Sequence, residues 1–309
     1  MSASAPSSSA VEPIESREMF ATILAVTFRI LSNPIGNAFQ KSLTNDNAHP
    51  LWVNFSTFAL LSTFCLWPAV AIQWGNLPRE FWVNSLLMGI FCASGNACLV
   101  AALQSGELSV LGPINAWKSI IGLIVAFVVL RELPSLAAFG GVALILVGSY
   151  FVLDAAPERF SFRLLCSNRS IRLRVMATVL AAIEAVFIKK VALASDASTA
   201  FYIWAAQGAL FSALALPLFR VKSRHELALM KSPKRIGKTL AIVLCVGVMQ
   251  WTTSYALARL SVGCALALFQ LSTLVGVLLG RQFFHEQGIA KKLVGSCIMI
   301  GGSVLVLLN

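Results

Sequence analysis

The chain has 309 residues, of which 58% are hydrophobic and only 12% are charged, and its formal net charge is +11. Soluble domains carry roughly 25% charged residues, so this chain lacks the polar side chains that a water-facing surface of its size would need. The composition excludes a soluble protein and predicts a polytopic membrane protein. Most Lys and Arg residues lie in breaks between apolar runs, where cytoplasmic loops and anionic lipid account for them, so nucleic-acid binding is not expected.

The first 19 residues form a Ser- and Ala-rich stretch that ends in several glutamates. No positively charged segment precedes a short apolar core there, so the pattern is not that of a signal peptide. We expect a disordered N-terminal tail over 1–19.

The apolar runs that follow predict ten membrane-spanning helices. A spanning helix needs about 20 mostly apolar residues, and several connections between the runs are too short for structure of their own. The two longer breaks, 154–173 and 220–237, are strongly basic. The expected spans are 20–40, 51–73, 82–104, 108–130, 135–153, 174–194, 200–219, 238–258, 261–281 and 289–308.

An internal repeat is the most regular feature of the sequence. The stretch 102–149 recurs without a gap 154 residues later, as 256–303. Each copy has a long apolar run, a short charged break and a second apolar run with Gly and Ser, so each predicts two membrane helices joined by a tight turn. The matched residues include Ala102 with Ala256, Leu103 with Leu257, Gly122 with Gly276, Glu132 with Glu286, Gly141 with Gly295, Gly148 with Gly302 and Ser149 with Ser303.

The repeat divides the chain into two five-helix halves, 20–153 and 174–309, joined by a basic connecting loop over 154–173. The fronts of the halves match more weakly, at an offset of 149 that pairs Lys41 with Lys190. Because five is odd, the second copy enters the membrane from the opposite side. The predicted fold is therefore an all-α integral membrane protein of ten transmembrane helices in two inverted repeats, an arrangement that places a substrate site near the bilayer midplane.

This pattern resembles the drug/metabolite transporter superfamily, in particular its EamA-type ten-helix members. The resemblance rests on the five-plus-five repeat, on Arg131-Glu132 and His285-Glu286 after spans four and nine, and on the Gly-rich helix after each pair. It covers the chain from about residue 20 to its end, and it implies a carrier of small metabolites, amino acids or drugs that works by alternating access. Both glutamates lack the preceding Gly that is usual in the family, so no binding role is transferred to them.

Two charges lie near the middle of corresponding spans, Arg29 in the first and Glu184 in the sixth. A charge deep in a spanning helix costs about 2.5–3.5 kcal/mol on insertion scales, so it indicates function by default. We predict that the two face each other, with Arg29 holding an anionic group of the substrate and Glu184 pairing with it or carrying a coupling proton. A fixed structural ion pair is an equally good interpretation.

Further polar and aromatic residues inside the spans are candidates for the wall of a solute cavity. Asn115 and Lys118 share a helical face, and Lys118 lies too far from the start of its span for snorkelling to be the better explanation. Asn96 and Gln250 correspond at the offset of 154 and place an amide at one depth in both halves, with helix-to-helix bonding as the alternative. The remaining candidates, for which packing is an equal explanation, are Trp117, Trp204, Gln207, Tyr255 and Gln270.

Lys and Arg counts leave the orientation open. Breaks after odd-numbered spans hold 16 of these residues and the other side holds 6. The positive-inside rule then places both termini outside. Resemblance to the superfamily implies the reverse, with both termini in the cytoplasm.

Sequence motifs for catalysis are missing. There is no His-Glu-x-x-His, P-loop or Gly-x-Ser-x-Gly, so neither an enzyme nor a bound cofactor or metal is expected. The cysteines fall mainly inside apolar runs without a Cys-x-x-Cys, which favours packing. We expect a secondary transporter of the inner (plasma) membrane that moves an amino acid, a nucleotide-like or a drug-like solute, coupled to protons or another ion, or by exchange. The alternatives are a non-transporting membrane scaffold and, behind it, an intramembrane enzyme.

Overall fold

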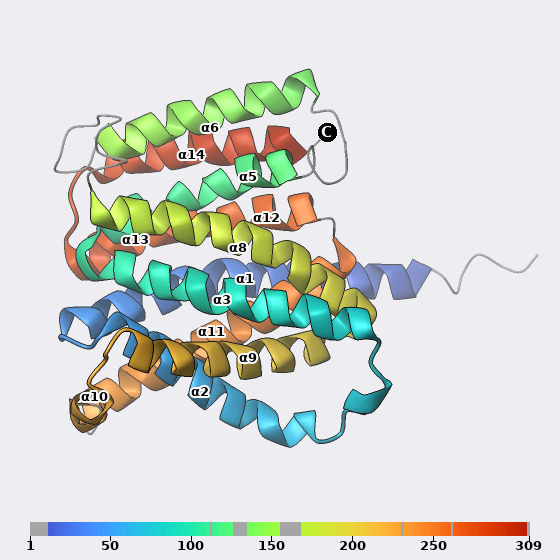
Figure 1. The fold of residues 1–309 in the computed structure, drawn as a ribbon. Coiled ribbons are helices and arrows are strands. Elements are labelled where there is room, and N and C mark those ends of the chain that lie inside the picture. The colour runs from blue at the N-terminus through green and yellow to red at the C-terminus, as the bar shows by residue number, and fades with distance from the viewer. Residues whose placement is uncertain are drawn as a thin grey trace, which may run out of the picture.

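A computed structural model of the chain describes residues 12–111, 113–125, 135–154, 168–229, 232–260 and 262–307, and over these residues the fold is all-helical. The long helices lie side by side with their axes roughly aligned across the molecule, whichever way the chain runs along them (Figure 1). Within the described residues, five helices are long and apolar enough to cross a membrane: Glu18–Asn45, Pro50–Ala69, Arg79–Ser105, Ala197–Leu218 and Pro233–Arg259.

Each predicted span overlaps one helix or a run of consecutive short helices. The all-helical membrane class is therefore confirmed, while the grouping into ten spans and two repeats stays a prediction. The first half contains α1 (Glu12–Asn45), α2 (Pro50–Ala69), η1 (Trp74–Asn76), α3 (Arg79–Ser105), α4 (Leu108–Leu111), η2 (Pro113–Ala116), α5 (Trp117–Val125) and α6 (Leu136–Asp154). The second half contains α8 (Arg169–Ala194), α9 (Ala197–Leu218), α10 (Ser223–Leu229), α11 (Pro233–Arg259), α12 (Val262–Gln270), α13 (Ser272–Phe284) and α14 (Ile289–Leu307).

Helices extend into several segments that we expected to be loops. Helix α1 begins at Glu12, inside the predicted tail. Helix α8 begins at Arg169, and the side chain of Asn168 caps it by accepting from two backbone N–H groups. Helix α10 lies within the predicted break 220–237. Residues 1–11 and 155–167 lie outside the described part of the chain.

Spans four and nine are interrupted rather than continuous. In span four, α4 ends at Leu111, and η2 then leads into α5 at Trp117; Pro113, which lacks a backbone N–H, begins η2. In span nine, Leu271 separates α12 from α13. The junctions Ala116/Trp117 and Gln270/Leu271 lie 154 residues apart, which is the offset of the sequence repeat. Arg131 and Glu132 lie outside the described residues.

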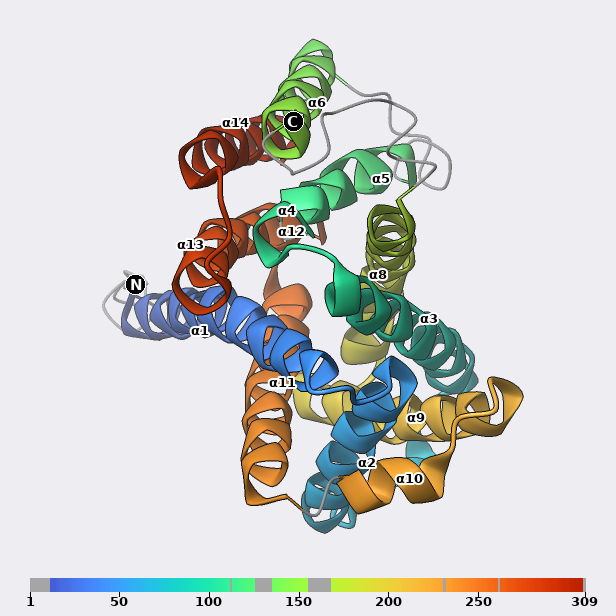
Figure 2. The same ribbon diagram turned by 90° about the vertical axis from the view of Figure 1, so that its left-hand side faces the viewer.

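Helices of one half pack mainly on helices of the other half. The most extensive contacts join α6 with α14, α3 with α8, α1 with α11 and α2 with α9. Viewed from the end of the bundle, α6 and α14 form one edge, α2, α9 and α10 form the opposite edge, and the other helices lie between them (Figure 2). The two halves therefore interlock instead of forming two separate bundles.

The glycines of spans five and ten bring the α6 and α14 backbones into contact, as the sequence indicated. A Cβ added at Gly148 would lie 2.5 Å from the carbonyl oxygen of Gly295, and one added at Gly302 would lie 2.6 Å from that of Gly141. Side chains on either helix would hold the backbones apart, so small residues are required at the crossing.

We predict that Gly148→Ala destabilises the protein by about 1–3 kcal/mol, because its methyl group would overlap backbone atoms of α14. Gly140→Ala is the matched control on the same helix, since a Cβ there meets nothing within 4 Å. Thermal unfolding of the purified variants in detergent checks the difference. Equal melting temperatures for the two variants would show that the α6–α14 contact is looser than described.

A network of buried charges joins the turn between α13 and α14 to the first half. Glu286 accepts from Lys41 Nζ at 2.8 Å and from the backbone N–H groups of Leu108 and Ser109 at 2.7 and 2.8 Å, so it caps the start of α4. Lys41 also donates to the carbonyl oxygen of Gly106 at 2.9 Å. Burial by itself would raise the pKa of Glu286, but the hydrogen bonds from Lys41 and Ser109 and the charge of Lys41 outweigh it and hold the pKa below its usual 4.5.

A lowered folded-state pKa means that Glu286 contributes stability above its unfolded pKa and loses it as the pH falls through the folded value. We therefore expect the melting temperature to fall on acidification below about pH 4.5. Glu286→Gln should lower it at neutral pH, since Lys41 loses its partner, and should flatten this acid response. Exposed Glu80 provides the control Glu80→Gln. An unchanged acid response in Glu286→Gln would contradict the assignment.

Candidate functional site

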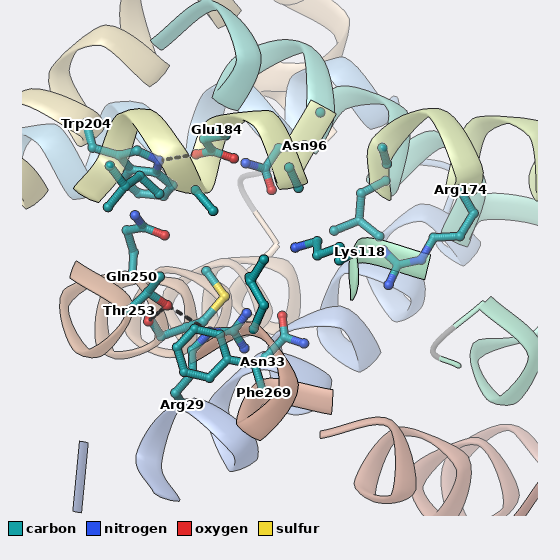
Figure 3. Close-up of a pocket in the computed structure, with 18 residues that line it drawn as sticks. Arg29, Asn33, Asn96, Lys118, Arg174, Glu184, Trp204, Gln250, Thr253 and Phe269 are labelled. Carbon is teal, nitrogen blue, oxygen red and sulfur yellow. Dashed lines mark hydrogen bonds between the residues drawn. The ribbon is translucent and has the colours of Figure 1, made fainter. Parts of the chain in front are cut away.

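A small cavity of about 90 Å³ lies among α1, α3, α5, α8, α9, α11 and α12, so both halves contribute to its wall (Figure 3). We call it the central cavity. Six of the residues singled out from the sequence line it. They are Arg29, Asn96, Lys118, Glu184, Trp204 and Gln250.

Glu184 is held on one side of the central cavity by an indole donor. Trp204 Nε1 donates to Glu184 Oε1 at 2.7 Å, and the two side chains come from neighbouring helices α8 and α9. The indole itself cannot move easily, because Phe58 packs edge-on against it at 4.8 Å and Phe201 stacks on it at 6.3 Å. The carboxylate therefore has a defined position, with one oxygen already engaged.

Arg29 lies on the opposite side of the central cavity and is fixed by two groups of the second half. Its Nε donates to Thr253 Oγ1 at 2.8 Å, and its guanidinium carbon lies 4.7 Å from the centre of the Phe269 ring. Buried Nη1 has no hydrogen-bond partner among the described residues. No ion pair joins Arg29 to Glu184 in this part of the chain, so the two face one cavity while each is held by neutral partners.

Lys118 and Arg174 add two further cations to the wall. The ammonium end of Lys118 points into the space between Asn96 and Asn33 (Figure 3). Arg174 Nε donates to the carbonyl oxygen of Leu111 at 2.7 Å, and α4 ends at this carbonyl, before the break at Pro113. Arg174 therefore stabilises the interrupted helix and lines the cavity.

Sequence reasoning counted Arg174 among the loop cations at the start of span six and passed over Asn33. Helical periodicity could have identified both. Starting from Glu184 and stepping back by three or four residues along α8 reaches Ala181, Ala177 and Arg174, all of which line the central cavity. In the same way, Asn33 lies four residues after Arg29 on α1. The spacing from the two midspan charges was the signal that could have identified both residues.

Two predicted site residues make contacts elsewhere. Trp117 Nε1 donates to Ser149 Oγ of α6 at 2.9 Å, which ties α5 to the α6–α14 edge. Gln207 Nε2 donates to Ser85 Oγ of α3 at 3.2 Å, so it joins α9 to α3. Neither side chain lines the central cavity, and their contacts are those of helix packing, the alternative that the sequence left open.

Of the other three predicted residues, two lie apart from the described wall and the side chain of the third is not described. Tyr255 is under the guanidinium of Arg259, whose central carbon lies 3.6 Å from the ring centre. Gln270 is fully buried at the junction between α12 and α13 without lining the cavity. Asn115 belongs to η2, but its side chain lies outside the described residues.

Comparison with known proteins relates part of the chain to a transporter family. Residues 17–154 match the EamA-like transporter family. A stretch of 129 residues is 26% identical to YtfF, an inner membrane protein of Escherichia coli (strain K12), and the match spans 37% of this chain and 40% of YtfF. The predicted resemblance to the drug/metabolite transporter superfamily is supported over residues 17–154, and the five long apolar helices fit an integral, multi-pass membrane protein.

A fold likeness extends over nearly the whole chain. A solved structure described as "Crystal structure of protein" shares 15% sequence identity with a TM-score of 0.65, and the match covers 93% of this chain and 96% of that one. At this identity the likeness concerns the fold alone.

We predict that Trp204→Phe lowers the stability of the protein by about 1.5–3 kcal/mol, because it removes a hydrogen bond to a buried charged group and keeps most of the ring. Trp251→Phe is the matched control, since Trp251 is 40% exposed and donates to Ser198 at 3.3 Å. Thermal unfolding measures both. If both variants unfold at the same temperature, the Trp204–Glu184 bond contributes nothing measurable.

Proposed function

We propose that the protein is a secondary transporter that moves a small polar or amphipathic metabolite by alternating access, with the central cavity as its solute site. The observation that carries the proposal is a buried, charged cavity between the two halves of an EamA-type chain. Buried ionisable groups in a membrane protein are costly, and they mark substrate and ion pathways.

The helix packing supports two inverted five-helix repeats. Matching the halves pairs α1 with α8, α2 with α9, α3 with α11 and α6 with α14. Exchanging each helix for its match turns the contact α1–α11 into α8–α3 and leaves the contacts α2–α9 and α6–α14 unchanged. The four main contacts therefore form a symmetric set. Helices α1 and α8 also run in opposite directions (Figure 1), as inversion requires.

Local contacts follow the same exchange. Lys41 Nζ donates to the carbonyl oxygen of Gly106 at the end of α3, and Lys189 Nζ donates to that of Leu260 at the end of α11, at 2.8 Å. Gly106 and Leu260 are matched at the offset of 154, and Lys189 precedes Lys190, the residue matched with Lys41. Equivalent contacts at opposite ends of the bundle are what a pseudo-two-fold axis in the membrane plane produces.

The size of the central cavity supports a rearrangement during transport. Sites for drug-sized ligands enclose roughly 300–1,000 Å³, whereas this cavity holds about 90 Å³. A metabolite can therefore enter and leave only if helices move. The interrupted elements, α4–η2–α5 and α12–α13, border the cavity and are the natural places for that movement, since discontinuous helices form substrate sites in related architectures.

Flux measurements in reconstituted vesicles test the proposal. We expect saturable uptake of at least one solute from a panel of amino acids, nucleosides, organic acids and amines into vesicles that contain the protein, above that of protein-free vesicles. Absence of flux for the whole panel from a folded protein would favour the scaffold alternative.

Glu184 is the carboxylate that could carry a coupling proton, since it is the sole carboxylate among the described lining residues. We predict that Glu184→Gln removes or shifts the pH dependence of uptake, because glutamine cannot exchange a proton. Glu80→Gln, at an exposed position, is the control. Uptake that keeps the same pH dependence in Glu184→Gln would end the proton role and leave exchange as the mechanism.

A further inference from the structure

Cationic side chains outnumber carboxylates around the central cavity. Arg29, Lys118 and Arg174 line it, and Glu184 is the single carboxylate among the described lining residues. Arg29 is 6% exposed, Arg174 5% and Glu184 7%. The formal charge of the wall is therefore +2, in a position where water cannot readily screen it.

Hydrogen-bond donors are also in excess. The unpaired buried side-chain atoms of the described cavity wall are Arg29 Nη1 and Gln250 Nε2, and both are donors. Lys118 presents its ammonium group to the same space (Figure 3). On the acceptor side, Glu184 Oε1 already accepts from Trp204. Because buried donors normally have acceptors, the cavity has fewer acceptor oxygens than its donors need.

The donors are held in position before any solute arrives. Thr253 engages Nε of Arg29 and Phe269 covers its guanidinium, which leaves Nη1 for another partner. Arg174 is anchored through Nε by the carbonyl of Leu111, so its terminal nitrogens are not consumed by that bond. An arginine fixed in this way binds carboxylate or phosphate oxygens with little further loss of side-chain entropy.

We infer that the solute of this transporter is an organic anion, whose carboxylate or phosphate oxygens are bound by Arg29, Lys118 and Gln250. The inference rests on the proposed function and narrows its substrate class. An oxyanion supplies the missing acceptors and offsets the uncompensated buried charge, which is otherwise costly. A cationic solute would increase the charge of the wall, and a zwitterion would leave it unchanged.

Binding measured by thermal shift tests the inference independently of transport. The probes are succinate for a carboxylate, glycerol 3-phosphate for a phosphate ester, alanine for a zwitterion and choline for a cation. At least one of the two anions should raise the melting temperature of the purified protein, and choline should not. The anion that acts distinguishes carboxylate from phosphate recognition.

Lys118→Met should abolish this stabilisation, or weaken the binding of the anion at least tenfold, because it removes the charge and keeps the length of the side chain. Lys222→Met is the matched control, since Lys222 is an exposed cation between α9 and α10. Arg29→Gln is a second variant, for use if Lys118→Met unfolds without ligand at a lower temperature than the control.

The outcomes separate the two claims. Stabilisation by an anion that Lys118→Met or Arg29→Gln removes, and that Lys222→Met retains, supports the inference. Stabilisation by alanine or choline alone, or an anion effect that survives both cavity variants, overturns it. Flux of alanine or choline without flux of either anion would also overturn it, yet would leave the proposed transport function standing. Anion binding without flux of any probe would instead count against the proposed function.

Discussion

Burial of charge among apolar helices is the constraint on which the rest of the structure depends. Three charged groups near the centre are each held by a group on another helix: Arg29 by Thr253, Glu184 by Trp204, and Arg174 by the carbonyl of Leu111. Because an isolated buried charge is expensive, these contacts fix the rotation of α1, α8, α9 and α11 relative to one another. The same contacts leave selected atoms facing the central cavity, so the arrangement that stabilises the fold also positions the side chains of the proposed solute site.

The features that recur at the offset of 154 and the features that differ between the two copies have separate roles in this chain. Elements that recur at the offset of 154 build the scaffold: the glycine contact of α6 with α14 and the interruptions of spans four and nine. The cavity wall is not symmetric, since Lys118 of α5 corresponds to Ser272 of α13. A scaffold with the proposed repeat can therefore present a site of net positive charge to an asymmetric solute.

Sequence reasoning located the helices and named six of the residues that line the central cavity, and what it could not give has a common physical cause. Hydropathy indicates that a segment is apolar and helical. A midspan charge such as Arg29 or Glu184 indicates that one face of the helix meets polar groups. Neither signal gives the rotation of one helix against the next. Arg29 and Glu184 therefore have their hydrogen-bond partners on other helices, and Gln207 and Tyr255 lie on faces of α9 and α11 that do not line the central cavity. Arg174 was missed because charge near a helix end resembles a loop.

The central claim is that the two halves are inverted relative to each other, and membrane topology tests it most directly. In a version without its native cysteines, single cysteines replace Gly75, between α2 and α3, or Lys222, between α9 and α10; both positions are exposed and follow matched helices. Labelling of intact cells with a membrane-impermeant maleimide should then modify one position, and the other only after the cells are opened. Labelling of both positions from the same side would contradict the inverted repeat.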